Sequence, residues 1–255
     1  MRDEDGGNLR SVRRAVTALE LIAEAGELGV SELGRRLDVH KATASRLVST
    51  LAERGLLERD PVNEKYRLGF GLVRLAGAAM AGLDIVREAH PVLEGLAERT
   101  RETVNLGVIS GDSVVYIDQV TGTRSVVAVS WIGRRTPLHC TSNGKVLLAF
   151  EAREDRERHL AEPLERLAER TIVDPAVLRT QLEEVVRTGY AQTIEELEEG
   201  LNAVAAPVRD GSGQVVAAVS ISGPAYRVTT DRIAELGALT VVAAGQIAVR
   251  LGFAG

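Results

Sequence analysis

Apolar side chains at spacings of three and four residues begin shortly after the start of the chain. This spacing predicts an amphipathic helix from Ser11 onward. Its apolar stripe consists of Val12, Val16, Leu19, Ile22 and Ala23. Gly26 and Gly29 then interrupt the pattern, because glycine disfavours the continuation of a helix. Residues 1–10 carry no such stripe, and we expect them to form a disordered tail.

Two further helices and a pair of strands are predicted next. Ser31 is the predicted N-cap of a helix that ends near Leu37. After a tight turn at residues 38–40, a longer helix is predicted over residues 41–54, where Gly55 stops it. Residues 56–59 and 65–68 have strand character, and the polar segment between them is typical of a hairpin tip.

The spacing of the inward positions indicates a helix-turn-helix. These positions are Leu33, Leu37, Val39, Ala44 and Leu47. Gly34 lies where the two helices approach each other. The turn position that usually carries glycine, because its φ is positive, holds Asp38, and Asp tolerates that conformation better than most residues. With the strand pair as a wing, the second helix fits a DNA major groove.

The remainder of the chain alternates predicted helices and strands. Residues 70–82 form a helix with little polar face, and a helix over residues 84–99 is expected to bend at Pro91. Further strands are predicted over residues 103–109, 114–120, 125–131, 202–208 and 215–222, and further helices over residues 142–151, 175–187 and 230–251. This order predicts an α+β domain with a mainly antiparallel sheet, separated from the first domain within residues 69–83.

Composition narrows the class of protein. The chain has 255 residues, of which 45% are hydrophobic and 26% charged, as in a soluble protein with one small and one medium domain. A single cysteine, Cys140, excludes an internal disulfide and fits a reducing cytosol. The pattern contains neither a signal peptide nor a membrane-spanning segment. We therefore expect a cytoplasmic protein with no membrane partner.

The distribution of charge is more informative than the net charge of −5. Residues 10–74 hold 12 Lys and Arg against 9 Asp and Glu, whereas residues 81–255 hold 18 against 24. Ordinary variation in composition also produces differences of this size. The functional interpretation is a DNA-facing N-terminal segment attached to an acidic body.

Side chains on the early, outward part of the second helix are candidates for DNA contacts. Arg46 is suited to read a guanine or to clamp a phosphate, and Lys41, Ser31 and Lys65 suit phosphate contacts. Each one alone is equally compatible with a solvated surface side chain, but the helix spacing and the wing favour DNA. The candidate set is Arg14, Ser31, His40, Lys41, Thr43, Ser45, Arg46 and Lys65.

Two features of the second domain suggest a ligand site. Ser220 and Ser222 stand two apart on an apolar strand, so both hydroxyls point to one face. Residues 137–144 lead into a helix whose first N–H groups form an anion-binding end. The alternatives are two satisfied hydroxyls and an ordinary capped helix start.

Three segments resemble the IclR family of bacterial regulators. They are SELGRRLDVHKATASRLVSTLAERGLLERDPVNEKYRLG at residues 31–69, PLHCTSNGKVLLAF at residues 137–150 and GLNAVAAPVRDGSGQVVAAVSISGPAYRVT at residues 200–229. The resemblance implies a winged helix-turn-helix over residues 11–69 and a linker helix for dimerisation over residues 70–83. It also implies a GAF-like effector-binding domain over residues 84–255, and a homodimer or a dimer of dimers.

The resemblance also implies an effector site. Matching the motifs position by position places it at Ser142, Asn143, Gly144, Thr193, Ala203, Ser220 and Ser222. Many family members carry Asp where this chain has Thr193 and Cys where it has Ala203. Without that carboxylate, the site should accept charged ligands differently, so no known effector is transferred. Our hypothesis is a small organic acid or aromatic acid.

Enzymatic and metal-binding interpretations find little support in the sequence. Gly144-Lys145 lacks the earlier glycine and the following Ser or Thr of a phosphate-binding loop, and the chain contains no Gly-x-Ser-x-Gly elbow. The histidines lack metal-ligand spacing, so no metal or cofactor is expected. We therefore predict a ligand-responsive transcriptional regulator on double-stranded operator DNA. The alternatives are an architectural or assembly DNA-binding protein without an effector, and an enzyme with a vestigial DNA-binding head.

Overall fold

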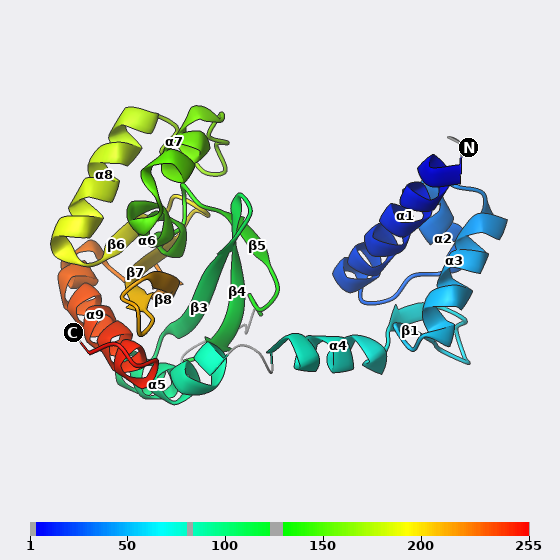
Figure 1. Ribbon diagram of the computed structural model, residues 1–255, viewed down its shortest axis with the longest axis horizontal. Helices are drawn as coiled ribbons and strands as arrows, with labels where there is room; N and C mark the ends of the chain where they lie inside the picture. The colour runs from blue at the N-terminus through cyan, green and yellow to red at the C-terminus, as the bar shows by residue number, and fades with distance from the viewer. Residues whose placement is uncertain (1–3, 81–83, 123–129, 255) are drawn as a thin grey trace. The chain divides into compact units, whose positions relative to one another are not determined.

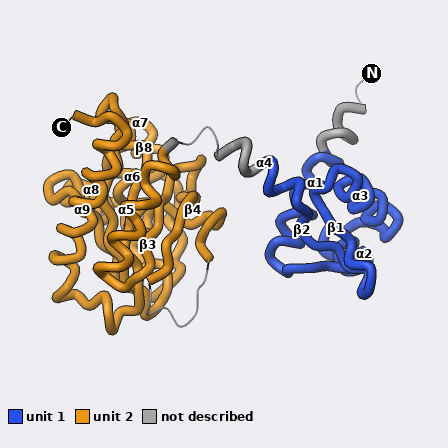
Figure 2. The backbone as a smooth tube through the Cα atoms, turned by 90° about the horizontal axis from the view of Figure 1, so that it is seen from below, with its two compact units in different colours: residues 1–82 blue, residues 83–255 orange. Residues whose placement is uncertain are grey.

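The computed structural model describes residues 4–80, 84–122 and 130–254. Contacts within the chain divide it into two compact units, residues 1–82 and residues 83–255, shown in different colours in Figure 2. Each unit has its own hydrophobic core. We call them the N-terminal unit and the C-terminal unit.

The N-terminal unit is a winged helix-turn-helix, as predicted. Its helices are α1 (Glu4–Ala25), α2 (Val30–Arg36), α3 (Lys41–Glu53) and α4 (Phe70–Met80), and its strands are β1 (Leu57–Arg59) and β2 (Tyr66–Leu68). The two strands pair antiparallel, with Leu57 opposite Leu68, and form the wing. Each strand is one residue shorter at its start than predicted. Figure 1 shows α2 and α3 as consecutive short helices beside α1.

The core of this unit differs in part from the predicted stripe on α1. Leu19 and Ile22 pack inward as expected, but Ala15 and Ala18 complete the buried face. Val12 and Val16 are instead 61% and 50% exposed. The larger hydrophobicity of valine suggested the wrong side of the helix, whereas the alanines leave room for the close approach of neighbouring elements. The buried core comprises Ala18, Ile22, Leu28, Leu33, Val48, Leu51, Leu57 and Tyr66.

Two helix starts also differ from expectation. Helix α1 begins at Glu4, so residues 4–10 are helical where a disordered tail was predicted. Extending an existing helix is easier than nucleating one, and each glycine costs only about 1 kcal/mol. The N-cap of α2 is Gly29 and not Ser31, because the Gly29 carbonyl already accepts a hydrogen bond from the Leu33 N–H at 3.0 Å.

The turn between α2 and α3 has the conformation that the sequence predicts. Asp38 has a φ of +51°, in the left-handed region. The Val39 N–H donates to the Gly34 carbonyl at 2.9 Å, which closes the turn. A Cβ atom at Gly34 would lie 3.2 Å from the Val39 carbonyl oxygen, so a larger residue there would press on the turn. These contacts fix the angle at which α3 leaves α2.

Within the described residues, the C-terminal unit contains one six-stranded antiparallel sheet in the order β5-β4-β3-β8-β7-β6. Its strands are β3 (Thr103–Ser110), β4 (Ser113–Val120), β5 (Arg135–Pro137), β6 (Ala191–Ile194), β7 (Leu201–Arg209) and β8 (Val215–Pro224). Its helices are α5 (Asp84–Thr100), α6 (Ser142–Phe150), α7 (Arg153–Ala161), α8 (Pro175–Thr188) and α9 (Ile233–Arg250), the last preceded by a short turn η1 (Thr230–Arg232). The predicted α+β class with a mainly antiparallel sheet is confirmed.

Helices cover both faces of this sheet (Figure 1). On one face, Val204, Ala206 and Val219 pack with α5 and α9. On the other, Ala205 and Ala218 pack with α6 and α8. Consecutive residues of a strand point to opposite faces, and this alternation divides the core into two layers.

Helix α9 is apolar because it lies in one of these layers. By length and composition alone, the segment Thr230–Arg250 could cross a membrane, and it is the one described helix of which this is true. In the structure its stripe of Ile233, Leu236, Ala243 and Ile247 is buried against the sheet. This is the stripe that the sequence predicts, and it accounts for part of the hydropathy of the helix, since Val242 and Val249 are exposed.

Three elements were not predicted from the sequence. Strands β5 and β6 are only three and four residues long, too short for a clear alternation. Helix α7 is almost entirely charged and buries only Leu160, so it has no apolar stripe to detect. The strand predicted over residues 125–131 falls mainly on residues 123–129, which lie outside the described residues. Pro91 lies inside α5.

The positive φ at Asp38 generates a stability prediction. We expect Asp38→Val to lower the stability of the N-terminal unit by about 1–2 kcal/mol, because a β-branched side chain resists the left-handed region. Asp38→Gly should be at least as stable as the natural protein. Urea unfolding followed by far-UV circular dichroism measures the difference. Asp38→Asn is the control, and equal stability of the Val and Gly variants would contradict the prediction.

Candidate functional site

Helix α3 presents a polar outer face. Lys41, Ser45 and Arg46 are exposed, while Ala44 and Val48 are buried against the rest of the N-terminal unit. His40 is the N-cap residue of the helix and is exposed, and Thr43 is half-buried. The amphipathic pattern that forms the core therefore also turns the predicted DNA-contacting side chains outward.

The positively charged side chains of this surface differ in whether they are paired with a carboxylate. Within the described part of the chain, neither Lys41 nor Arg46 forms an ion pair with a carboxylate. Lys65 of the wing instead donates to Glu27 at 2.7 Å. A phosphate at Lys65 would have to compete with that carboxylate, whereas Lys41 and Arg46 are unpaired.

Two candidates lie away from the start of α3. Ser31 is exposed within α2, and Arg14 is half-buried on α1. Wing residues pair among themselves, with Arg59 and Glu64 joined at 2.8 Å. The outer face of α3 is therefore the part of this surface with the most free hydrogen-bond donors.

The second candidate site is a cavity in the C-terminal unit. Its enclosed volume is about 30 Å³, and the space among its lining atoms, open solvent included, is about 390 Å³. Six of the seven residues that the family resemblance suggested line it. They are Ser142, Asn143, Thr193, Ala203, Ser220 and Ser222.

Strand register explains why these residues meet. Thr193 on β6 pairs with Ala203 on β7, which pairs with Ser222 on β8. Ser220 pairs with Asn105 on β3. Directly opposed residues in an antiparallel sheet point to the same face, so these side chains form two adjacent rows on one face that together span four strands. The start of α6 lies over that face.

Gly144 does not line the cavity, contrary to prediction. A Cβ atom there would lie 2.1 Å from the Leu138 carbonyl oxygen, so glycine allows the helix to pack against the preceding loop. The Thr141 hydroxyl caps this helix, accepting from the Gly144 N–H at 3.1 Å and donating to the Pro137 carbonyl at 3.0 Å. The first N–H groups of a helix have no partner within it. The N–H groups of Ser142 and Asn143 have no partner within the helix, and the side chains of both residues line the cavity.

The cavity contains a buried amide with an unused acceptor. Asn105 is 3% exposed and donates from Nδ2 to the Ser222 hydroxyl at 3.2 Å. Its Oδ1 is buried without a hydrogen-bond partner. An unsatisfied buried polar atom costs about 1–3 kcal/mol. A ligand group that donates a hydrogen bond would remove this penalty.

Aromatic and apolar side chains complete the lining. Tyr116 and Trp131 meet edge to face, with ring centroids 5.8 Å apart. A bulge between Leu106 and Gly107 shifts the register of β3 and β4 and turns Tyr116 toward this face. None of the described residues that line the cavity is charged. Six lining residues were not predicted from the sequence: Asn105, Tyr116, Trp131, Thr141, Leu197 and Leu201. Of these, only Asn105 had a usable signal, because it is a polar residue in an apolar strand.

The described residues support neither thiol-based catalysis nor metal binding. Burial raises the pKa of the Cys140 thiol to about 12, so the thiolate form is not available near neutral pH. Among the described residues, no group of three or more His, Cys, Asp or Glu side chains is arranged to hold a metal ion. What the structure offers is a polar helix face in one unit and an uncharged cavity in the other.

A winged helix-turn-helix joined to an α+β domain that contains a cavity is the architecture of a two-domain regulator. Comparison with known proteins gives the family. A model described as the IclR helix-turn-helix domain matches residues 11–61, and one described as the bacterial transcriptional regulator IclR C-terminal domain matches residues 77–249. The chain belongs to the IclR family of DNA-binding transcriptional regulators.

Individual relatives match almost the whole chain. The regulator KdgR of Escherichia coli is 35% identical over 98% of this chain and 96% of its own length. The regulator BhcR of Paracoccus denitrificans is 36% identical over 96% of this chain and 88% of its own. A crystal structure of an IclR homologue from Microbacterium hydrocarbonoxydans, complexed with 4-hydroxybenzoate, has a TM-score of 0.84 at 29% identity, covering 95% of this chain and 98% of that one.

The buried thiol generates a chemical prediction. We expect Cys140 in the native protein to react with a thiol reagent such as DTNB at pH 8 at least a hundredfold more slowly than in urea. Its folded pKa lies above the unfolded value, so the protonated thiol is favoured in the folded state until the pH approaches about 12. Absorbance at 412 nm follows the reaction. Complete reaction of the folded protein within minutes would contradict the assignment.

Proposed function

We propose that this protein is a cytoplasmic, ligand-responsive transcriptional regulator that binds a specific operator in double-stranded DNA and a small organic acid. This proposal is carried by one observation: described residues from five strands and one helix, none of them charged, line one cavity. The family supports the regulatory role. An enzymatic role has no support from Cys140, because its thiol stays protonated.

DNA contact is assigned to the outer face of α3. Arg46 and Lys41 are exposed and unpaired within the described residues, which suits a guanine edge and a phosphate. Ser45, Thr43 and His40 lie beside them at the start of the helix. Contacts from Ser31, Arg14 and Lys65 are assigned to phosphates at the margin of the site.

The ligand is assigned to the cavity as an organic or aromatic acid with a hydroxyl group. A carboxylate suits the free N–H groups of Ser142 and Asn143 at the start of α6, together with the hydroxyls of Ser220 and Ser222. The unpaired Oδ1 of Asn105 requires a donor, which a hydroxyl supplies. Tyr116 and Trp131 offer an aromatic wall. The homologue complexed with 4-hydroxybenzoate supports this class of ligand.

Regulation follows from assembly as a homodimer or a dimer of dimers. Two copies of α3 would enter successive major grooves of a near-palindromic site, about 34 Å apart. Ligand binding would alter the arrangement of the two reading heads through α4. Such coupling is typically about 1–3 kcal/mol.

Removing the Arg46 guanidinium should abolish sequence preference. We expect Arg46→Ala to weaken operator binding by about 1–3 kcal/mol while leaving binding to scrambled DNA less changed. Fluorescence anisotropy with DNA from directly upstream of the protein's own gene, at two salt concentrations, measures both. Arg153→Ala, on charged α7, is the control. Equal loss of preference in both variants, or in neither, would overturn the role of Arg46.

Trp131 is the only tryptophan of the chain, so intrinsic fluorescence reports on the cavity. We expect a hydroxybenzoate to bind about tenfold more tightly than benzoate, because only the former satisfies Asn105. In Asn105→Leu this preference should disappear. Binding of neutral or cationic analogues in place of every acid would show that the cavity does not select a carboxylate.

A further inference from the structure

Two parts of the cavity wall come from segments that are not paired with each other in the sheet. One part is the start of α6, with Ser142 and Asn143. Another part of the wall is formed by Leu197, which lies in the connection between β6 and β7, and Leu201 at the start of β7. We call residues 195–200 the wall segment. It has neither helix nor strand structure, so other contacts must fix its position.

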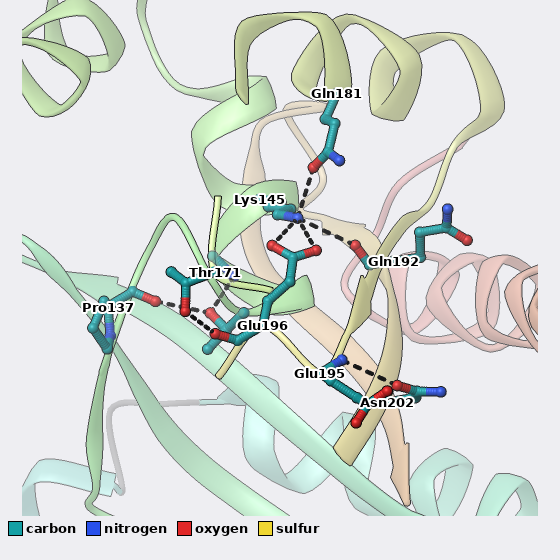
Figure 3. Close-up of polar contacts among 10 residues, drawn as sticks. Pro137, Lys145, Thr171, Gln181, Gln192, Glu195, Glu196 and Asn202 are labelled. Atoms are coloured by element: carbon teal, nitrogen blue, oxygen red, sulfur yellow. Dashed lines mark hydrogen bonds and ion pairs between the residues drawn. The ribbon is translucent and has the colours of Figure 1, made fainter. Parts of the chain in front are cut away.

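A buried ion pair joins these two parts of the wall. The Lys145 Nζ donates to both carboxylate oxygens of Glu196 at 2.6 Å. It also donates to the Gln181 Oε1 at 2.7 Å and to the Gln192 carbonyl at 3.4 Å (Figure 3). Lys145 lies one helical turn after Ser142, and Glu196 directly precedes Leu197. The pair therefore connects the helix that begins at the cavity to the segment that contains Leu197.

Other hydrogen bonds make the wall segment a compact turn. The Thr171 hydroxyl donates to the Glu196 carbonyl at 2.6 Å, and Figure 3 shows it on the opposite side of Glu196 from Lys145. The Glu195 N–H donates to the Asn202 Oδ1 at 3.1 Å and to the Leu201 carbonyl at 3.0 Å. Glu196 is thus held through both its main chain and its side chain.

Stability alone does not account for a charged pair in this place. Lys145 is 1% exposed and Glu196 is 5% exposed. Burial lowers the pKa of Lys145 and raises that of Glu196, and the attraction between the two opposes both shifts. Replacing a buried pair with apolar side chains of similar size is often neutral or stabilising, whereas removing one partner is costly. What apolar side chains do not supply is directional hydrogen bonding.

We propose that the Lys145–Glu196 ion pair positions the wall segment across the effector cavity and thereby sets effector affinity. Lys145 and Glu196 are positioning residues, since neither group lines the cavity itself. The affinity part of this proposal rests on the proposed function. The positioning part is independent of any ligand, which allows the two to be tested separately.

The first experiment uses the ligand-free full chain. Lys145→Met/Glu196→Leu removes both charges together. We expect global stability in urea close to that of the natural protein, but at least tenfold faster amide hydrogen exchange in residues 195–201 and stronger acrylamide quenching of Trp131. Exchange in α9 should not change. The exposed pair Arg179–Glu157, joined at 2.6 Å between α8 and α7, supplies the control variant Arg179→Met/Glu157→Leu, in which residues 195–201 should be unaffected.

Glu196→Gln covers the case in which the double variant does not fold. It keeps the shape of the side chain and one acceptor for Lys145, and we expect at least threefold faster exchange in residues 195–201. If Glu196→Gln folds and its amide exchange in residues 195–201 stays within twofold of that in the natural protein, the proposal is overturned.

Hydroxybenzoate binding to the same variants forms the second arm. A tenfold loss of affinity supports the proposal. Unchanged affinity despite faster exchange overturns the link to the effector. If no acid binds even the natural protein, the proposed effector fails, while the exchange data still decide the positioning role.

Discussion

Alternation of side chains across β-strands is the constraint on which the C-terminal unit depends. Neighbouring residues of β3, Val104 and Asn105, point to opposite faces, one into the α5–α9 core and the other into the cavity. The same holds for Ile221 and Ser222 on β8. Strands β3 and β8 therefore supply apolar side chains to that core and polar side chains to the cavity, whose lining also includes the start of α6 and Leu197 of the wall segment.

Much of this organisation was predictable because it depends on local patterns. Helix spacing gave the helix-turn-helix to within a residue at α3, and the positive φ at Asp38 followed from its place in the turn. Paired serines on an apolar strand, Ser220 and Ser222, indicated the face of the sheet that lines the cavity. These features need only a few neighbouring residues, so one sequence suffices to show them.

What escaped prediction depends on contacts distant in the chain. Tyr116 reaches the cavity through a bulge, which depends on pairing between β3 and β4 and leaves no mark in the alternation. Lys145 and Glu196 stand far apart in sequence, and each alone has the character of a surface residue. Gly144 matched the family motif, yet its role is a close contact with Leu138 and not with the cavity. Val12 misled because hydrophobicity alone does not say which side of a helix will be covered.

The close contact at Gly144 has a consequence for how ligand specificity diversifies. Any side chain there would drive the start of α6 away from Leu138, so this backbone position tolerates little variation. Thr193 and Ala203, by contrast, contribute only side chains to the lining of the cavity, and exchanging them leaves the sheet pairing intact. New effectors are thus expected to arise by substitution on the strands and not at the helix start, because only the strand positions can change without disturbing the packing of the backbone.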